Sequence, residues 1–204
     1  MIILAIETSC DDTGISILEA KESGKGDTFK ILANNLHSQV KIHAKYGGVF
    51  PALAKREHQK NLPILLVKTL RQTKTKMEKI DIITVTTGPG LEPALWTGIV
   101  FARELGDKYN LPIIPVNHME GHIFSIFPKK GKTFTINLDK KIFPVLSLLI
   151  SGGHTELVVS KDFRKYKIRQ SIVPTTYINF LTFVVSYFFL SSYLPILVNF
   201  IIRN

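Results

Sequence analysis

Residues 2–18, IILAIETSCDDTGISIL, determine the fold class expected for this chain. The stretch holds two short apolar runs, Ile2–Ile6 and Ile15–Leu18, on either side of the polar segment Glu7–Gly14. Apolar runs rich in β-branched residues around a polar turn are typical of two buried strands joined as a hairpin. The polar segment ends in Asp-Thr-Gly, which are residue types that turns favour. The chain is therefore predicted to open with a β-hairpin in its core.

Beyond this hairpin, strand-like and helix-like segments alternate. The expected strands are 30–34, 80–86, 112–116, 144–150 and 156–159, and the expected helices are 51–59, 62–72, 93–109 and 118–127. Pro63 is expected to break the helical pattern between 51 and 72, and the lysine-rich segment 129–141 is predicted to be a loop or a hairpin insertion. An opening hairpin followed by this alternation predicts an α/β fold.

The composition narrows the class of protein further. Of the 204 residues, 45% are hydrophobic and 21% are charged, which indicates a folded chain and excludes a disordered one. The single cysteine excludes an intramolecular disulfide framework and fits a reducing compartment. A signal peptide is not expected, because Met1–Ile6 runs directly into Glu7. The net charge of +10 favours an acidic partner such as nucleic acid, although solvated lysines alone would give the same total.

The composition changes abruptly at about Arg169–Gln170. From Ser171 to Ile202 no side chain is charged, and Phe, Ile, Leu and Tyr dominate. One interpretation is a membrane span, because the uncharged segment Tyr177–Leu194 is near the lower length limit for crossing a bilayer. The other, which we favour, is a frameshifted reading frame, since T- and A-rich codons encode these residue types.

The polar segment Glu7–Gly14 is the first candidate site. Its hydroxyls and its turn glycine allow backbone N–H groups to face an anion, as phosphate-binding loops do. Asp11 or Asp12 would hold a phosphate-bound metal there or orient an attacking group. The alternative is an ordinary turn with solvated acids. Cys10 has no paired cysteine and no histidine nearby in sequence, so it is interpreted as incidental rather than as a nucleophile.

Two histidines form the second candidate site. His118 and His122 are four residues apart in a predicted helix, which places them on one face about 5–6 Å apart at Cβ. This spacing suits a shared transition metal, which needs at least one more ligand. Glu120 points to a different face, and the alternative is a pair of surface histidines. The remaining histidines follow no such spacing and are assigned no function: His37, His43, His58 and His154.

Two glycine loops are further candidates. Ser151-Gly152-Gly153-His154-Thr155 follows a predicted buried strand directly, and its paired glycines permit close approach of the backbone to a ligand. Gly88-Pro89-Gly90 lies between a predicted strand and the start of a helix. Each is also compatible with an ordinary turn.

Taken together and in order, six separated motifs resemble the bacterial tRNA N6-adenosine threonylcarbamoyltransferase family, formerly labelled O-sialoglycoprotein endopeptidase. The motifs are Ile6–Thr13, His37–Val40, Tyr46–Pro51, Gly88–Leu91, Asn117–His122 and Ser151–Thr155. The resemblance extends to about residue 168 and covers only the first half of such a protein. It implies the actin-like, sugar-kinase and Hsp70-like ATPase fold, with a first lobe over 1–145, the start of a second lobe over 146–168, and a non-family tail over 169–204.

The resemblance also implies a reaction and its residues. Threonylcarbamoyl passes from threonylcarbamoyl-adenylate to N6 of adenosine 37, in tRNAs that read codons starting with A. His118 and His122 match the family's ligands for one metal ion, iron (Fe²⁺) or zinc, and Asp11 matches an acidic catalytic residue of the first loop. The substrate-binding stretch matches Leu149, Ile150, Ser151, Gly152 and Gly153. The family's third metal ligand is an aspartate far along the second lobe, beyond the matched residues.

The family implies a cytoplasmic protein whose partners are tRNA, a non-catalytic paralogue and a small ATPase, with a membrane added only if the hydrophobic tail is native sequence. Two alternatives remain open. A metallopeptidase would suit the historical label, but Met119 stands where the His-Glu-x-x-His pattern requires glutamate. A membrane-anchored, non-catalytic fragment is the other.

Overall fold

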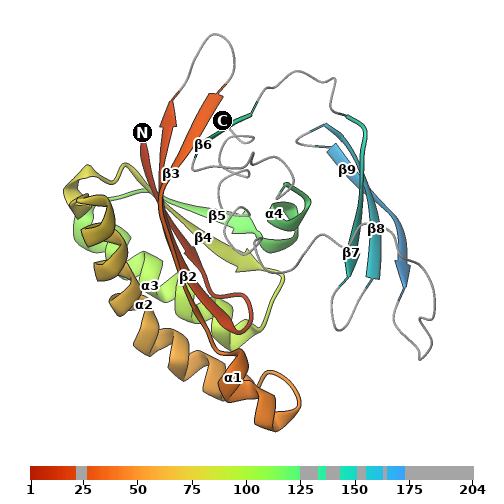
Figure 1. The fold of residues 1–204 in the computed structure, drawn as a ribbon, viewed down its shortest axis with the longest axis horizontal. Helices are drawn as coiled ribbons and strands as arrows, with labels where there is room; N and C mark the ends of the chain where they lie inside the picture. The colour runs from red at the N-terminus through yellow and green to blue at the C-terminus, as the bar shows by residue number, and fades with distance from the viewer. Residues whose placement is uncertain (22–26, 125–132, 137–142, 151–154, 163–164, 173–204) are drawn as a thin grey trace.

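A computed structural model describes residues 1–21, 27–124, 133–136, 143–150, 155–162 and 165–172 of the chain. In these parts of the chain the strands form two sheets (Figure 1). The larger is a six-stranded mixed sheet in the order β5-β4-β1-β2-β3-β6, and the smaller is a three-stranded antiparallel sheet in the order β7-β8-β9. The α/β class predicted from the sequence is confirmed.

The larger sheet is built around the opening hairpin. Its strands are β1 (Ile2–Glu7), β2 (Asp12–Lys21), β3 (Asp27–Ser38), β4 (Ile82–Gly88), β5 (Ile113–Asn117) and β6 (Thr133–Ile136). β1 pairs with β2 in antiparallel register, with Ile6 opposite Ile15 and Glu7 opposite Gly14, as the hairpin prediction requires. On its other side β1 is parallel to β4, which is parallel to β5. The carboxyl ends of β1, β4 and β5 therefore meet at one edge.

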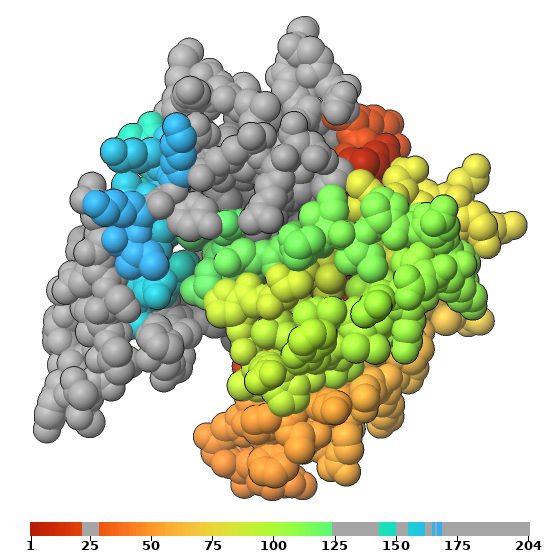
Figure 2. Space-filling model, turned by 180° about the vertical axis from the view of Figure 1, so that it is seen from behind, coloured from red at the N-terminus to blue at the C-terminus, as the bar shows by residue number. Residues whose placement is uncertain are grey.

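Helices cover both faces of this sheet. They are α1 (Val40–His43), α2 (Pro51–Thr73), α3 (Glu92–Tyr109) and α4 (His118–Phe124), with short 3₁₀ turns η1 (Ala44–Tyr46) and η2 (Met77–Lys79). α2 and α3 lie side by side on one face, and α4 lies on the other, between the two sheets (Figure 1). The space-filling view shows α2 and α3 together as an outer face of the molecule (Figure 2).

β1 is buried on both faces, which explains why its sequence is continuously apolar. Because side chains alternate along a strand, Leu4 and Ile6 pack into the core beneath α2 and α3. Ile3 and Ala5 point the other way, into a core that includes Ile123 of α4. Burial of each large apolar side chain contributes about 1.5–3 kcal/mol. This strand therefore joins the two cores of the molecule.

The predicted break at Pro63 is wrong. α2 continues through Pro63 as one helix, with Pro51 in its first turn. Pro63 has no N–H to offer the carbonyl of Gln59, four residues earlier. Both Pro63 and Gln59 are exposed, so this carbonyl lies on the solvent side of the helix, where water can satisfy it.

The smaller sheet begins as predicted and adds one strand. β7 (Val145–Ile150) and β8 (Thr155–Asp162) form a hairpin, and β9 (Lys165–Ile172) pairs with β8 so that Ser171 lies opposite Glu156. The first residues of the predicted tail, 169–172, therefore belong to β9. The uncharged segment Tyr177–Leu194 lies outside the described residues, so both interpretations of the tail remain predictions. Within the described part of the chain, no helix is long and apolar enough to cross a membrane.

Candidate functional site

Polar side chains gather where the three parallel strands end. Glu7 is the last residue of β1, Gly88 ends β4, and Asn117 ends β5. The Asn117 side-chain oxygen accepts hydrogen bonds from the backbone N–H groups of Met119, at 2.8 Å, and Glu120, at 3.1 Å, and so caps the start of α4. His118 consequently begins α4 at the edge where open α/β sheets generally bind ligands.

Glu7 lies beneath His118 as a buried carboxylate that is 1% exposed. Its Oε1 accepts a hydrogen bond from the Ser9 backbone N–H at 2.6 Å, and its Oε2 accepts one from the Thr86 hydroxyl. Oε2 also lies 3.4 Å from His118 Nδ1. Burial acts to raise the pKa of Glu7, but the hydrogen bond and charge of His118, with the hydrogen bonds from Ser9 and Thr86, lower the pKa overall. The site therefore contains an ionised carboxylate.

The two histidines lie in contact, as their spacing predicted. His118 Nε2 and His122 Nε2 are 2.9 Å apart, and the rings meet edge to face with centroids 4.5 Å apart. Burial, followed by the charge of His118, lowers the pKa of His122 to about 4. His122 is thus neutral at physiological pH, which is the form that binds metals.

The donor set fits two ligands of a metal site. Two imidazole nitrogens that converge in this way suit iron or zinc. The described residues contain no group of three or more His, Cys, Asp or Glu side chains placed to hold one ion. The described part of the chain therefore supplies two ligands, and any further ligand must come from elsewhere.

Ser9 also approaches His118, but the arrangement is not a nucleophilic triad. Its Oγ lies 3.2 Å from His118 Nδ1 and 3.5 Å from Nε2. In a Ser-His-Asp/Glu triad the hydroxyl and the carboxylate use opposite ring nitrogens. Here Ser9 and Glu7 both lie nearest to Nδ1, so His118 is not placed to accept the Ser9 proton on one ring nitrogen while Glu7 orients it through the other.

The loop between β1 and β2 carries the other acidic candidates. Asp11 is half-buried in this loop, and its backbone carbonyl accepts a hydrogen bond from the Gln39 N–H at 2.9 Å. Partial burial and the neighbouring Asp11 raise the pKa of the Cys10 thiol to about 12. A protonated thiol is a weak nucleophile, in agreement with the interpretation of Cys10 as incidental. Burial also raises the pKa of Asp12.

A buried polar network that the sequence did not reveal fixes this loop. The His58 side chain is fully buried, and its Nε2 donates to the Cys10 carbonyl oxygen at 3.0 Å. Its Nδ1 accepts from the Thr13 hydroxyl at 2.8 Å and from the Gln39 amide at 3.3 Å. The Gln39 carbonyl oxygen in turn accepts from His43 Nε2 at 2.9 Å. Residues from α1 and α2 thus hold both ends of the turn.

The glycine loop after β4 packs directly against the same turn. The Leu91 N–H donates to the Ser9 carbonyl oxygen at 2.7 Å. A Cβ atom at Gly90 would lie 2.5 Å from that oxygen, so only glycine fits there. The Thr8 hydroxyl donates to the Ala94 carbonyl oxygen at 2.9 Å. The loop therefore helps to position Ser9 beside His118.

The predicted substrate-binding stretch is described only in part. Leu149 is buried and packs in the core with Val116, Ile123 and Val158. The Ile150 backbone pairs with Thr155 at the end of the β7–β8 hairpin. Ser151, Gly152 and Gly153 lie outside the described residues, so the role of the stretch remains a prediction.

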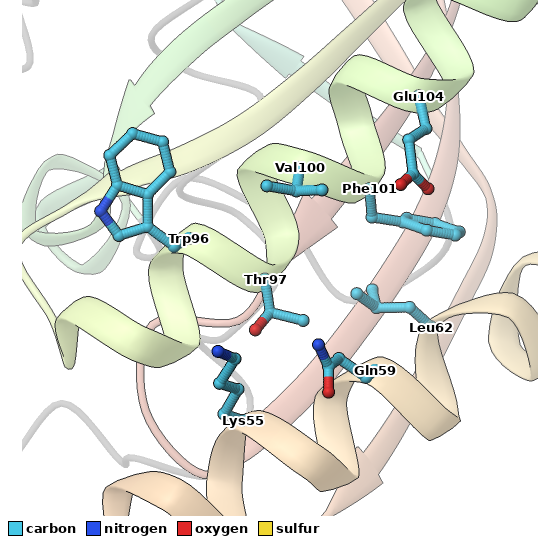
Figure 3. Close-up of a pocket in the computed structure, with 8 residues that line it drawn as sticks. All are labelled: Lys55, Gln59, Leu62, Trp96, Thr97, Val100, Phe101 and Glu104. Carbon is cyan, nitrogen blue, oxygen red and sulfur yellow. The ribbon is translucent and has the colours of Figure 1, made fainter.

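A separate groove of about 280 Å³ runs between α2 and α3 and shares no residue with the histidine site. Figure 3 shows side chains of α2 facing those of α3 across it. The lining residues are Lys55, Gln59, Leu62, Trp96, Thr97, Val100, Phe101 and Glu104. Trp96 is 56% exposed and Val100 is 48% exposed, so α3 presents two large apolar side chains to solvent beside the groove.

Fold and site together define an α/β protein that carries a histidine pair at the carboxyl edge of its parallel strands. The sequence profile of the tRNA N6-adenosine threonylcarbamoyltransferases matches residues 30–182. The chain belongs to this family, which confirms the resemblance seen in the sequence.

Relatives support the assignment. The tRNA N6-adenosine threonylcarbamoyltransferase of Buchnera aphidicola subsp. Schizaphis graminum is 43% identical over 168 residues, which are 82% of this chain and 45% of the relative. That of Dictyoglomus turgidum is 45% identical over 168 residues, which are 82% and 46% of the two chains. The chain therefore spans less than half the length of these curated relatives.

A solved structure shows that the fold is shared. YeaZ from Pseudomonas aeruginosa superposes with a TM-score of 0.52 at 12% identity, and the match covers 85% of this chain and 67% of that one. At this identity the likeness concerns the fold alone.

Proposed function

We propose that the chain carries the first part of an enzyme that transfers threonylcarbamoyl from threonylcarbamoyl-adenylate to N6 of adenosine 37 in tRNA. Membership of the family supports this reaction. The observation that carries the proposal is the convergence of His118 Nε2 and His122 Nε2, 2.9 Å apart. This pair lies at the edge of the sheet where a nucleotide-sized ligand is expected.

In this proposal His118 and His122 hold one metal ion, iron or zinc, together with a ligand from outside the described residues. When bound, the metal supplies a Lewis acid that polarises a substrate carbonyl. The low pKa of His122, about 4, keeps its imidazole neutral and available as a ligand. The ionised carboxylate of Glu7, which lies beside His118, would offset the positive charge of the metal ion.

The first loop and the glycine hairpin complete the proposed site. Asp11 acts as the catalytic acid–base group toward the attacking amine. Leu149–Gly153, at the end of β7 and directly after it, contributes substrate contacts through its backbone. The larger sheet with its helices corresponds to the first lobe of an actin-like ATPase fold, and β7–β9 begins the second lobe.

The proposed partners are tRNA, a non-catalytic paralogue and a small ATPase, in the cytoplasm. The net charge of +10 supports association with tRNA phosphates. The exposed apolar side chains of Trp96 and Val100 on α3 support a protein partner on that face. A membrane partner is proposed only if the hydrophobic tail, residues 169–204, is native sequence.

The test measures N6-threonylcarbamoyladenosine in tRNA by mass spectrometry. A bacterial strain depleted of its own enzyme receives residues 1–168 of this chain, fused to the remaining part of the Dictyoglomus turgidum relative. We expect the fusion to restore the modified nucleoside. The same fusion with His118→Ala and His122→Ala should fold and should fail to restore it.

The test also includes a control variant and a result that would refute the proposed reaction. An exposed control, His37→Ala, loses a histidine on the surface of the chain and should retain full activity. A fusion that is folded by circular dichroism and contains metal, yet leaves the tRNA unmodified, would refute the proposed reaction.

A further inference from the structure

We propose that Glu7 is a positioning residue that fixes the tautomer of His118, so that its Nε2 lone pair points toward His122. This inference rests on the proposed function, because it concerns the same histidine pair. It adds a residue that the spacing of the histidines does not reveal. Glu7 lies in β1, 111 residues before His118 in the sequence.

The argument begins with the partners of His118 Nδ1. This nitrogen faces Glu7 Oε2 at 3.4 Å and Ser9 Oγ at 3.2 Å. Both Glu7 oxygens already accept hydrogen bonds, Oε1 from the Ser9 N–H and Oε2 from the Thr86 hydroxyl, so the carboxylate faces Nδ1 as an acceptor and stabilises the His118 tautomer that carries its proton there. Nε2 is then unprotonated and carries the lone pair that a metal needs.

The orientation of the carboxylate is itself fixed. Oε1 accepts from the Ser9 backbone N–H at 2.6 Å, and Oε2 accepts from the Thr86 hydroxyl. A backbone N–H cannot become an acceptor, so the position of Oε1 always requires an oxygen. Thr86 belongs to β4, and its side chain is buried. Glu7 is therefore held by the loop that follows β1 and by β4, with Oε2 directed at His118.

The same tautomer accounts for the contact between the two rings. With His118 Nε2 unprotonated, His122 Nε2 donates its proton across the 2.9 Å that separates the two atoms. Without metal, His122 donates a hydrogen bond to His118, and His118 donates one to Glu7. His118 would offer its Nε2 lone pair to a metal without a change of tautomer, whereas His122 would first have to move its proton from Nε2 to Nδ1. His118 is thus the preorganised ligand of the two.

A substitution that keeps the shape of Glu7 tests this logic. In Glu7→Gln the Ser9 N–H still requires an oxygen, so the new amide NH₂ occupies the position of Oε2. It then faces His118 Nδ1 as a donor and drives the histidine proton to Nε2. The matched control is Glu92→Gln, which removes the same charge from an exposed residue in the first turn of α3.

The experiment records long-range ¹H–¹⁵N spectra of the full 204-residue chain labelled in histidine, without metal, at pH 7.5. We expect His118 to be protonated on Nδ1 in the unchanged chain and in Glu92→Gln, and on Nε2 in Glu7→Gln. Zinc titration of the same samples should show affinity about tenfold lower or more for Glu7→Gln.

The readouts separate the role of Glu7 from the proposed metal site. His118 protonated on Nε2 in the unchanged chain overturns the role of Glu7, and this result needs no variant to fold. The same tautomer in Glu7→Gln as in Glu92→Gln also overturns it. If zinc binds none of the chains, the two histidines alone do not hold a metal, and the tautomers alone decide the role of Glu7.

Discussion

At the residue scale, the buried His58 makes the stability of the fold depend on pH. Burial lowers its pKa, so below the ordinary value of 6.5 the unfolded chain binds a proton that the folded chain does not. Stability must therefore fall as the pH drops through about 6.5 and below. His58→Gln should be less stable at pH 7.5 by about 1–3 kcal/mol, because its buried partners are left without a hydrogen bond.

The same variant should also lose less stability on acidification, because one titrating group is gone. Urea denaturation at pH 7.5 and pH 5.5 measures both effects, with the exposed His37→Gln as the matched control. Parallel pH dependence in His58→Gln and the unchanged chain would show that His58 titrates normally in the folded protein.

At the element scale, α3 packs so closely against the loop between β1 and β2 that the contact depends on a glycine, Gly98. A Cβ atom at Gly98 would overlap the Thr8 hydroxyl, which is buried and bonded to Ala94. Gly98→Ala should therefore displace α3 and destabilise the chain by about 1–3 kcal/mol, despite the better helix propensity of alanine. Gly48→Ala is the matched control, because nothing lies within 4 Å of its added methyl group. Equal thermal stability of the two variants would contradict this close packing.

Helices and strands that are marked by a pattern of apolar residues within one short segment were predicted well. Contacts between residues far apart in the sequence were not predicted. The opening hairpin and α3 follow from runs of apolar residues that sequence spacing shows directly. β9 was missed because Lys165–Ile172 is polar and charged, and it is a strand only through pairing with β8. His118 and His122 were found because four residues make about one turn of a helix. Glu7 was passed over because its only sequence signal is a lone carboxylate at the end of a buried strand.

At the scale of the whole molecule, the position of the positive charge predicts which surface would meet tRNA in the proposed function. α2 carries exposed cations on the turns around His58, the residue that contacts the first loop. These cations are Lys55, Arg56 and Lys60. A second set lies at and beyond the other end of the helix, about 20 Å farther along at 1.5 Å per residue. Its members are Lys74, Lys76 and Lys79.

In the proposed reaction the target adenosine reaches the histidine pair, so we expect the set beside His58 to bind tRNA phosphates. Changing its three cations to glutamine should weaken binding and reduce the slope of log affinity against log salt by about one for each phosphate that is no longer neutralised. The same changes in the distant set remove equal charge and should leave the slope nearly unchanged. Fluorescence anisotropy with labelled tRNA at several salt concentrations measures both slopes. If the two triple variants weaken binding equally, only the total charge matters, and the site near the first loop does not orient the tRNA.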